Sequence, residues 1–127
     1  MKLRIKGNTL RFRLTQSEVK AIENGEVISE KTFFGPKKFF EFTLGTKLFM
    51  QQIETDFTDG KIETWIPSNI ALNWAKSDSV GIEHSQENAQ EEKLYILIEK
   101  DFKCLTERSN EDESDNYPHP KEKDISC

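Results

Sequence analysis

The sequence predicts an α+β fold that is mainly β, with about ten short strands and two short helices. Two observations lead to this class. Apolar residues alternate with charged ones over several stretches that glycine-containing turns separate, and two short stretches place apolar residues at helical spacing. With 127 residues, the chain is expected to form a single domain over residues 1–105, followed by an acidic, irregular tail over residues 106–127.

The first half of the chain predicts a hairpin, a helix and two strands. Gly7-Asn8 tolerates the positive φ of a hairpin turn, and Thr15 and Glu18 have the spacing of a capping box. Gly25 is placed to end the helix. The expected elements are a hairpin over residues 2–14, a helix over 15–24, and strands over 26–34 and 37–44.

The second half predicts the same order of elements. Asp59-Gly60 is a second hairpin turn, and Pro67 suits the first turn of a helix. Lys100 and Asp101 are predicted to lie at the solvated end of the last strand. The expected elements are strands over 47–57 and 61–66, a helix over 67–76, a strand that opens at Val80, a polar loop over 84–92, and an apolar, central strand over 94–98.

The two halves indicate an internal duplication into tandem ββαββ units, over residues 1–45 and 46–101. Apolar residues recur at a constant offset of 52, so that Leu14, Val19 and Ile22 correspond to Ile66, Ala71 and Trp74. Two such units could close into one barrel around a pseudo-two-fold axis. Chance similarity is the alternative, because short β-rich chains can share an element order.

A basic ribbon on the first hairpin is the strongest candidate site. Alternation along the hairpin places five cations on the face opposite its apolar residues, namely Lys2, Arg4, Lys6, Arg11 and Arg13. Several phosphate contacts of this kind would give salt-dependent nucleic-acid binding. The alternatives are a solvated sheet face or a cradle for the chain's own acidic residues 111–113. Phe33, Phe34 and Trp65 are the aromatic residues available for base stacking, although all three are predicted to lie in the core.

These patterns predict a non-catalytic binding or regulatory module that engages an anionic partner, with DNA as the polyanion considered. One alternative is a protein-interaction module that acts through the acidic tail and its Tyr117-Pro118-His119-Pro120 segment. A second is a small enzyme that uses Cys104 as its nucleophile. No cofactor is expected, because the glycines are isolated at turns and form no phosphate-binding loop.

The sequence also predicts neither a metal site nor a membrane partner. Cys104, His119 and Cys127 have spacings that match no compact zinc pattern. No apolar run reaches the length of a signal peptide or of a bilayer span. We therefore expect a cytoplasmic protein.

Each half resembles the swapped-hairpin domains of AbrB-like regulators and MazE-like antitoxins. In the first half the resemblance rests on residues 6–14, a short helix and residues 25–27, and in the second on residues 60–67 and 78–80. In that family two such units, usually from two chains, interlock, and basic residues of the paired hairpins hold DNA. The resemblance therefore implies a DNA-binding role for the basic ribbon.

The second half departs from that family pattern. Its counterparts of the ribbon are Lys61, Glu63 and Trp65, so the resemblance implies one basic hairpin where the family has two. The chain as a whole also resembles a small bacterial family of unknown function, which implies no activity.

Overall fold

The computed structural model describes residues 1–88, 92–102 and 114–118. It confirms the α+β class, with eight strands and two short helices in the described part of the chain. The elements in chain order are β1 (Lys2–Lys6), β2 (Thr9–Leu14), α1 (Gln16–Glu23), β3 (Ile28–Gly35), β4 (Lys38–Lys47), β5 (Glu54–Thr58), β6 (Lys61–Pro67), α2 (Ser68–Lys76), β7 (Gly81–Glu87) and β8 (Lys93–Lys100).

The strands form two four-stranded sheets that exchange hairpins. Sheet A has the order β1-β2-β8-β7, and sheet B has the order β3-β4-β6-β5. In sheet A, the β1–β2 hairpin that precedes α1 pairs with the β7–β8 hairpin that follows α2, through the parallel pair β2 and β8. In sheet B, the β5–β6 hairpin that precedes α2 pairs with the β3–β4 hairpin that follows α1, through the parallel pair β6 and β4. Each half of the chain therefore contributes one hairpin to each sheet.

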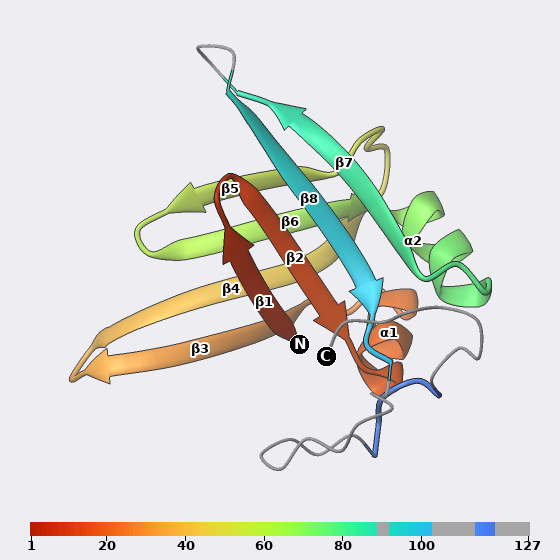
Figure 1. The fold of residues 1–127 in the computed structure, drawn as a ribbon, viewed down its shortest axis with the longest axis horizontal. Coiled ribbons are helices and arrows are strands. Elements are labelled where there is room, and N and C mark those ends of the chain that lie inside the picture. The colour runs from red at the N-terminus through yellow and green to blue at the C-terminus, as the bar shows by residue number, and fades with distance from the viewer. Residues whose placement is uncertain (89–91, 103–113, 119–127) are drawn as a thin grey trace.

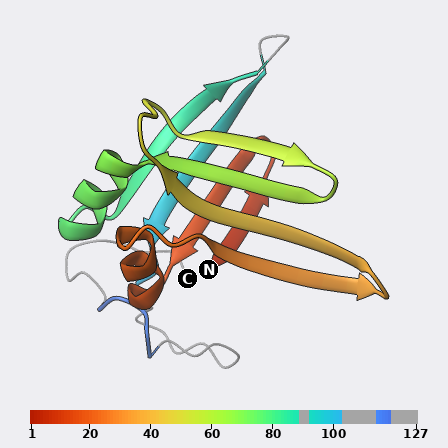
Figure 2. The ribbon, with the colours of Figure 1, turned by 180° about the vertical axis from the view of Figure 1, so that it is seen from behind.

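The two sheets form two crossed layers, with sheet A in front in Figure 1 and sheet B in front in Figure 2. Both helices lie at one end of the layers, where α1 contacts α2. Between the layers, the Phe12 ring of sheet A packs against the Phe42 ring of sheet B at 6.3 Å between centroids. Ile22 of α1 and Trp74 of α2 are buried in the same core.

Local sequence signals explain the ends of the elements. The Thr15 backbone N–H donates to Glu18 Oε1 at 2.9 Å, as a capping box at the start of α1 requires. Asp59 and Gly60 have φ of 51° and 74°, the two positive values of the hairpin turn that Asp-Gly favours. The predicted turn between β5 and β6 and the predicted start of α1 are thus confirmed.

The closed barrel that two such units could form is not found in the described part of the chain. No described strand of sheet A pairs with a described strand of sheet B, so the sheets keep separate edges. Side chains join the edges instead. Gln86 of β7 accepts from the Thr55 N–H of β5 at 2.8 Å and donates to the Thr55 carbonyl at 2.9 Å. The sheets diverge too far there for a backbone ladder, and one amide side chain spans the gap.

Two predicted boundaries also need correction. The loop expected over residues 84–92 is a strand as far as Glu87, because pairing with β8 satisfies the backbone while one face stays exposed and polar. The strand expected over residues 47–57 is divided. Its first residue, Lys47, ends β4, and β5 begins only at Glu54.

Part of the expected tail packs on the domain. The Gln16 N–H donates to the Asp115 carbonyl at 3.1 Å, and the Tyr117 N–H donates to the Asp101 carbonyl at 2.8 Å. The rings of Tyr117 and Phe102 lie 5.3 Å apart between centroids. Residues 114–118 thus join the end of β8 to the start of α1.

Candidate functional site

The β1–β2 hairpin brings the predicted cations together on the outer face of sheet A. In the strand register Lys2 lies opposite Arg13, and Arg4 lies opposite Arg11. Directly opposed like charges destabilise an antiparallel pair. The arrangement therefore needs anions nearby, from the chain itself or from a partner.

Carboxylates of the chain neutralise one end of this basic ribbon. The Arg11 guanidinium binds Glu99 of β8, and Arg13 Nε lies 3.8 Å from the same carboxylate. Lys2 Nζ lies 3.0 Å from Asp101 Oδ2, and the Asp101 side chain is only 2% exposed. The end of the ribbon nearest the helices is thus internally paired.

The other end of the ribbon is the hairpin tip. Arg4 and Lys6 are exposed there, and neither forms an ion pair within the residues that the structure describes. The tip is held in place, because the Asn8 amide donates to the Lys93 carbonyl of β8 and the Tyr95 N–H donates to the Asn8 carbonyl at 3.0 Å. Arg4 and Lys6 are therefore exposed cations on a hairpin whose turn is held in place, and phosphate groups of a polyanion can contact them.

Lys100 and Asp101, predicted to be solvated, are buried. Lys100 is 6% exposed, and its Nζ donates to the Ser77 carbonyl at 2.6 Å beyond the end of α2. Its ammonium lies 5.9 Å from the centre of the Trp74 ring and 5.7 Å from that of Tyr117. Burial lowers the pKa of Lys100, and Asp78 acts in the opposite direction. The sequence lacked any signal for this burial, because it depends on α2 and residues 114–118 covering the strand end.

Two of the three aromatic residues assigned to the core are exposed. Phe33 and Phe34 of β3 are 67% and 73% exposed, because the β3–β4 hairpin extends beyond the opposite sheet (Figures 1 and 2). Trp65 is half-buried, with Lys47 Nζ 4.5 Å from its ring centre and Gly45 beneath it. The position of each aromatic residue in the fold, and not its residue type, therefore determines whether its ring is exposed to a partner.

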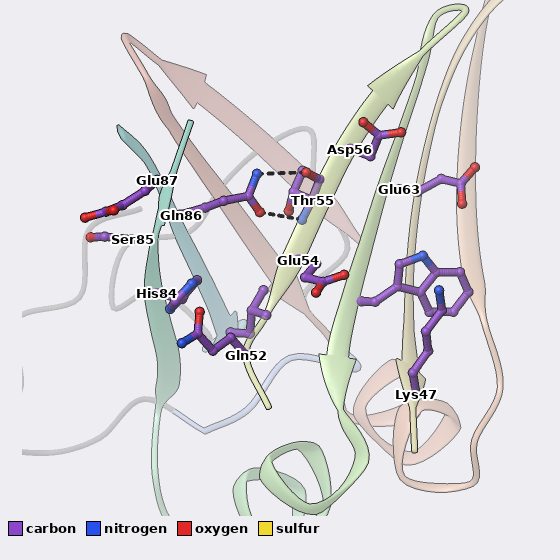
Figure 3. A pocket seen from close by; sticks show the side chains of 12 residues that line it. Lys47, Gln52, Glu54, Thr55, Asp56, Glu63, His84, Ser85, Gln86 and Glu87 are labelled. Atoms are coloured by element: carbon purple, nitrogen blue, oxygen red, sulfur yellow. Dashed lines mark hydrogen bonds between the residues drawn. The ribbon is translucent and has the colours of Figure 1, made fainter. Parts of the chain in front are cut away.

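A polar hollow of about 820 Å³ lies between the edges of β5 and β7 (Figure 3). Figure 3 shows Gln86 reaching across to Thr55, with His84 beside it on β7. Acidic residues of both sheets line the hollow, namely Glu54, Asp56, Glu63 and Glu87. Among the described residues, no group of three His, Cys, Asp or Glu side chains is close enough to hold a metal ion. The hollow is therefore a charged, polar surface without a metal-binding cluster among the residues that the structure describes.

Several predicted features lie outside the described residues, namely Cys104, Cys127, His119 and the acidic residues 111–113. Neither helix in the described part has the length and apolar composition to cross a membrane.

Comparison with other proteins gives a family and no activity. No curated protein and no solved structure matches the chain. The resemblance to AbrB-like and MazE-like domains thus stays a prediction. The family model of DUF7009, a family of unknown function, matches residues 1–121, and the chain belongs to that family.

Proposed function

We propose that the protein is a non-catalytic binding module that holds a polyanion, with DNA as the test case, on the β1–β2 face of sheet A. The observation that carries the proposal is the opposed pair Arg4 and Arg11, with Lys6 beside it at an exposed tip. Opposed like charges cost stability; Glu99 offsets part of this cost at Arg11, and an anion bound beside Arg4 would offset more of it.

The neighbouring carboxylates set the strength of the site. Glu99 engages Arg11 and lies near Arg13, so a phosphate at that end must compete with a carboxylate already in place. Arg4 and Lys6 face no such competition in the described chain. We expect weak, salt-dependent binding that begins at the hairpin tip, since each phosphate neutralised contributes through counterion release.

The test is fluorescence anisotropy with a mixed pool of duplex DNA over a salt series. The double variant Arg4→Ser/Lys6→Ser is expected to reduce the slope of log K against log salt by about two, one for each lost phosphate contact. The matched control is Lys20→Ser/Lys76→Ser, which removes two exposed cations from the helices and should leave the slope unchanged.

A third variant tests the competition directly. Glu99→Gln keeps the shape of the side chain but removes the charge that pairs with Arg11, so DNA binding should become tighter. Absence of binding at low salt by both the native protein and Glu99→Gln would overturn the proposal. The protein-interaction alternative would then be the better account.

A further inference from the structure

The β3–β4 hairpin ends in an exposed tip of aromatic and basic residues. Phe39 is 44% exposed, and its neighbours Phe33 and Phe34 are more exposed still. Residues 31–40 contain three lysines and no acidic residue, the lysines being Lys31, Lys37 and Lys38. Figure 2 shows this hairpin extending away from the body of the molecule. Exposed rings gathered at one place mark an interaction site.

The tip projects beyond the acidic hairpin next to it in sheet B. The pairing of β4 with β6 begins at Glu41 and Lys61, and the Glu41 N–H donates to the Gly60 carbonyl at 3.1 Å. The β5–β6 turn, with its Asp59, therefore lies beside the base of the tip. Lys38 is farther out by roughly 10 Å of extended strand, the length that three residues span. The end of the β3–β4 hairpin thus keeps its positive charge.

Rings and cations lie side by side on the tip. Phe33 and Phe39 are cross-strand partners, and their ring centres are 5.4 Å apart with the ring planes tilted by 48°. Lys31 is two residues from Phe33 on the same face of β3, and its Nζ lies 5.1 Å from the Phe39 ring centre. A ligand on this face therefore meets flat apolar surface and positive charge at the same depth.

The order of residues along the tip distinguishes between two kinds of anionic partner, a lipid surface and a nucleic acid. A hairpin that enters lipid needs its rings outermost and its cations behind them, because charge is costly in hydrocarbon. Here Lys37 and Lys38 lie at the turn, farther out than the paired rings of Phe33 and Phe39. A nucleic acid presents flat bases beside phosphates, and it matches rings and lysines that lie side by side.

We infer that the β3–β4 tip binds single-stranded nucleic acid, with bases stacked on Phe33 and Phe34 and phosphates held by Lys37 and Lys38. The faces of the bases are open in a single strand and covered by neighbouring base pairs in a duplex, so the tip should prefer single strands. The inference goes beyond the polyanion proposal, because the ribbon belongs to sheet A and the tip to sheet B. Each site can therefore be tested without the other.

The first test uses fluorescence anisotropy to compare a labelled thymidine oligonucleotide with the same strand annealed to its complement. Phe33→Ser should weaken single-strand binding by at least about fivefold, the effect of losing one base stack, and should leave duplex binding unchanged. Phe33→Trp keeps a ring at this position and should retain single-strand binding. The matched control is Phe49→Ser, which removes a fully exposed ring from the β4–β5 connection and should change neither affinity.

The second test assigns the site. Lys37→Ser/Lys38→Ser should lower the slope of log K against log salt for the single strand by about 1.4, about 0.7 for each lost phosphate contact. In an Arg4→Ser/Lys6→Ser background, Phe33→Ser should still weaken single-strand binding.

Three outcomes would overturn the inference. The native protein binds no single strand at low salt, or its single-strand binding does not respond to Phe33→Ser; duplex binding through the ribbon is judged separately in both cases. The third outcome is sedimentation with phosphatidylserine vesicles that Phe33→Ser abolishes, without any binding of the oligonucleotide, which would assign the tip to a lipid surface.

Discussion

The β1–β2 and β5–β6 hairpins occupy equivalent places in the fold and present opposite chemistry. Each precedes a helix and supplies the inner member of a parallel pair, β2 against β8 and β6 against β4. Toward the core both are closed to solvent, with Leu14 and Ile66 each fully buried. Toward solvent, Arg11 of the first hairpin corresponds to Glu63 of the second. The core constrains one face of each hairpin, and the other face is free to differ.

The neighbouring strands differ along with the hairpins. Arg13 lies opposite Glu99, and its counterpart Trp65 lies opposite Gly45. A charged pair in sheet A thus corresponds to a ring packed on a glycine in sheet B. The lesson is that the shared topology depends on buried apolar contacts, while partner choice depends on the outer faces. The predictions below separate these two contributions.

The largest effect is expected from the core that both halves share. Trp74 of α2 is 1% exposed, and its Nε1 donates to the Val80 carbonyl at 3.1 Å. Trp74→Ala should lower the free energy of unfolding by about 3–5 kcal/mol, through a cavity and an unpaired carbonyl. Urea denaturation measures this value. Leu72→Ala, on an exposed position of the same helix, should cost less than about 1 kcal/mol. Equal losses in the two variants would contradict a common core built around Trp74.

A smaller effect should distinguish the two sheets at equivalent positions. A Cβ at Gly45 would lie 2.7 Å from Cζ3 of Trp65 and 2.9 Å from Cγ2 of Val27. Gly45→Ala should therefore cost about 1–3 kcal/mol, because the indole must move. Glu99→Ala, at the corresponding position of sheet A, removes partly exposed ion pairs and should cost about 1 kcal/mol or less. Thermal unfolding of the two variants gives the comparison, and a reversed order would show that Trp65 does not depend on Gly45.

The sequence predicted most of the local structure because local signals determine it. The capping box at Thr15, the Asp59-Gly60 turn and the central position of the last apolar strand are all confirmed. The pairing of β2 with β8 could not be predicted, since it joins segments more than 80 residues apart and alternation does not say which strand is a neighbour.

The candidate site was predicted less completely than the fold. Alternation placed the ribbon cations on one face, but the pairing of Arg11 with Glu99 needed that same long-range contact. Phe33 and Phe34 have the composition of a core strand and are exposed, because their hairpin is longer than the layer that would cover it. The lengths of neighbouring elements decided their exposure, and no single segment carries that information.

The smallest predicted effect concerns the first turns of the two helices, which also occupy equivalent places. Asp115 packs at the start of α1, where hydrogen bonds from Ser17 and Thr15 lower the pKa of its carboxyl. The first turn of α2 contains no acidic residue. A carboxyl whose pKa is lower in the folded protein stabilises it above its unfolded pKa of about 3.9, and this contribution is lost as pH falls through the folded value.

Acidification below about pH 4 should therefore loosen the start of α1 before that of α2. Amide hydrogen exchange measures the opening of each helix start. The Gln16 N–H, which donates to the Asp115 carbonyl, reports on α1, and the first amides of α2 report on α2. Ser17→Ala should return the pKa of Asp115 toward its ordinary value and weaken the pH dependence at Gln16. Because Asp115 lies at the surface and is only partly buried, global stability should hardly change. Loss of protection at both helix starts together would instead mean that acid acts on the whole core, and that the difference between the two halves does not extend to their helices.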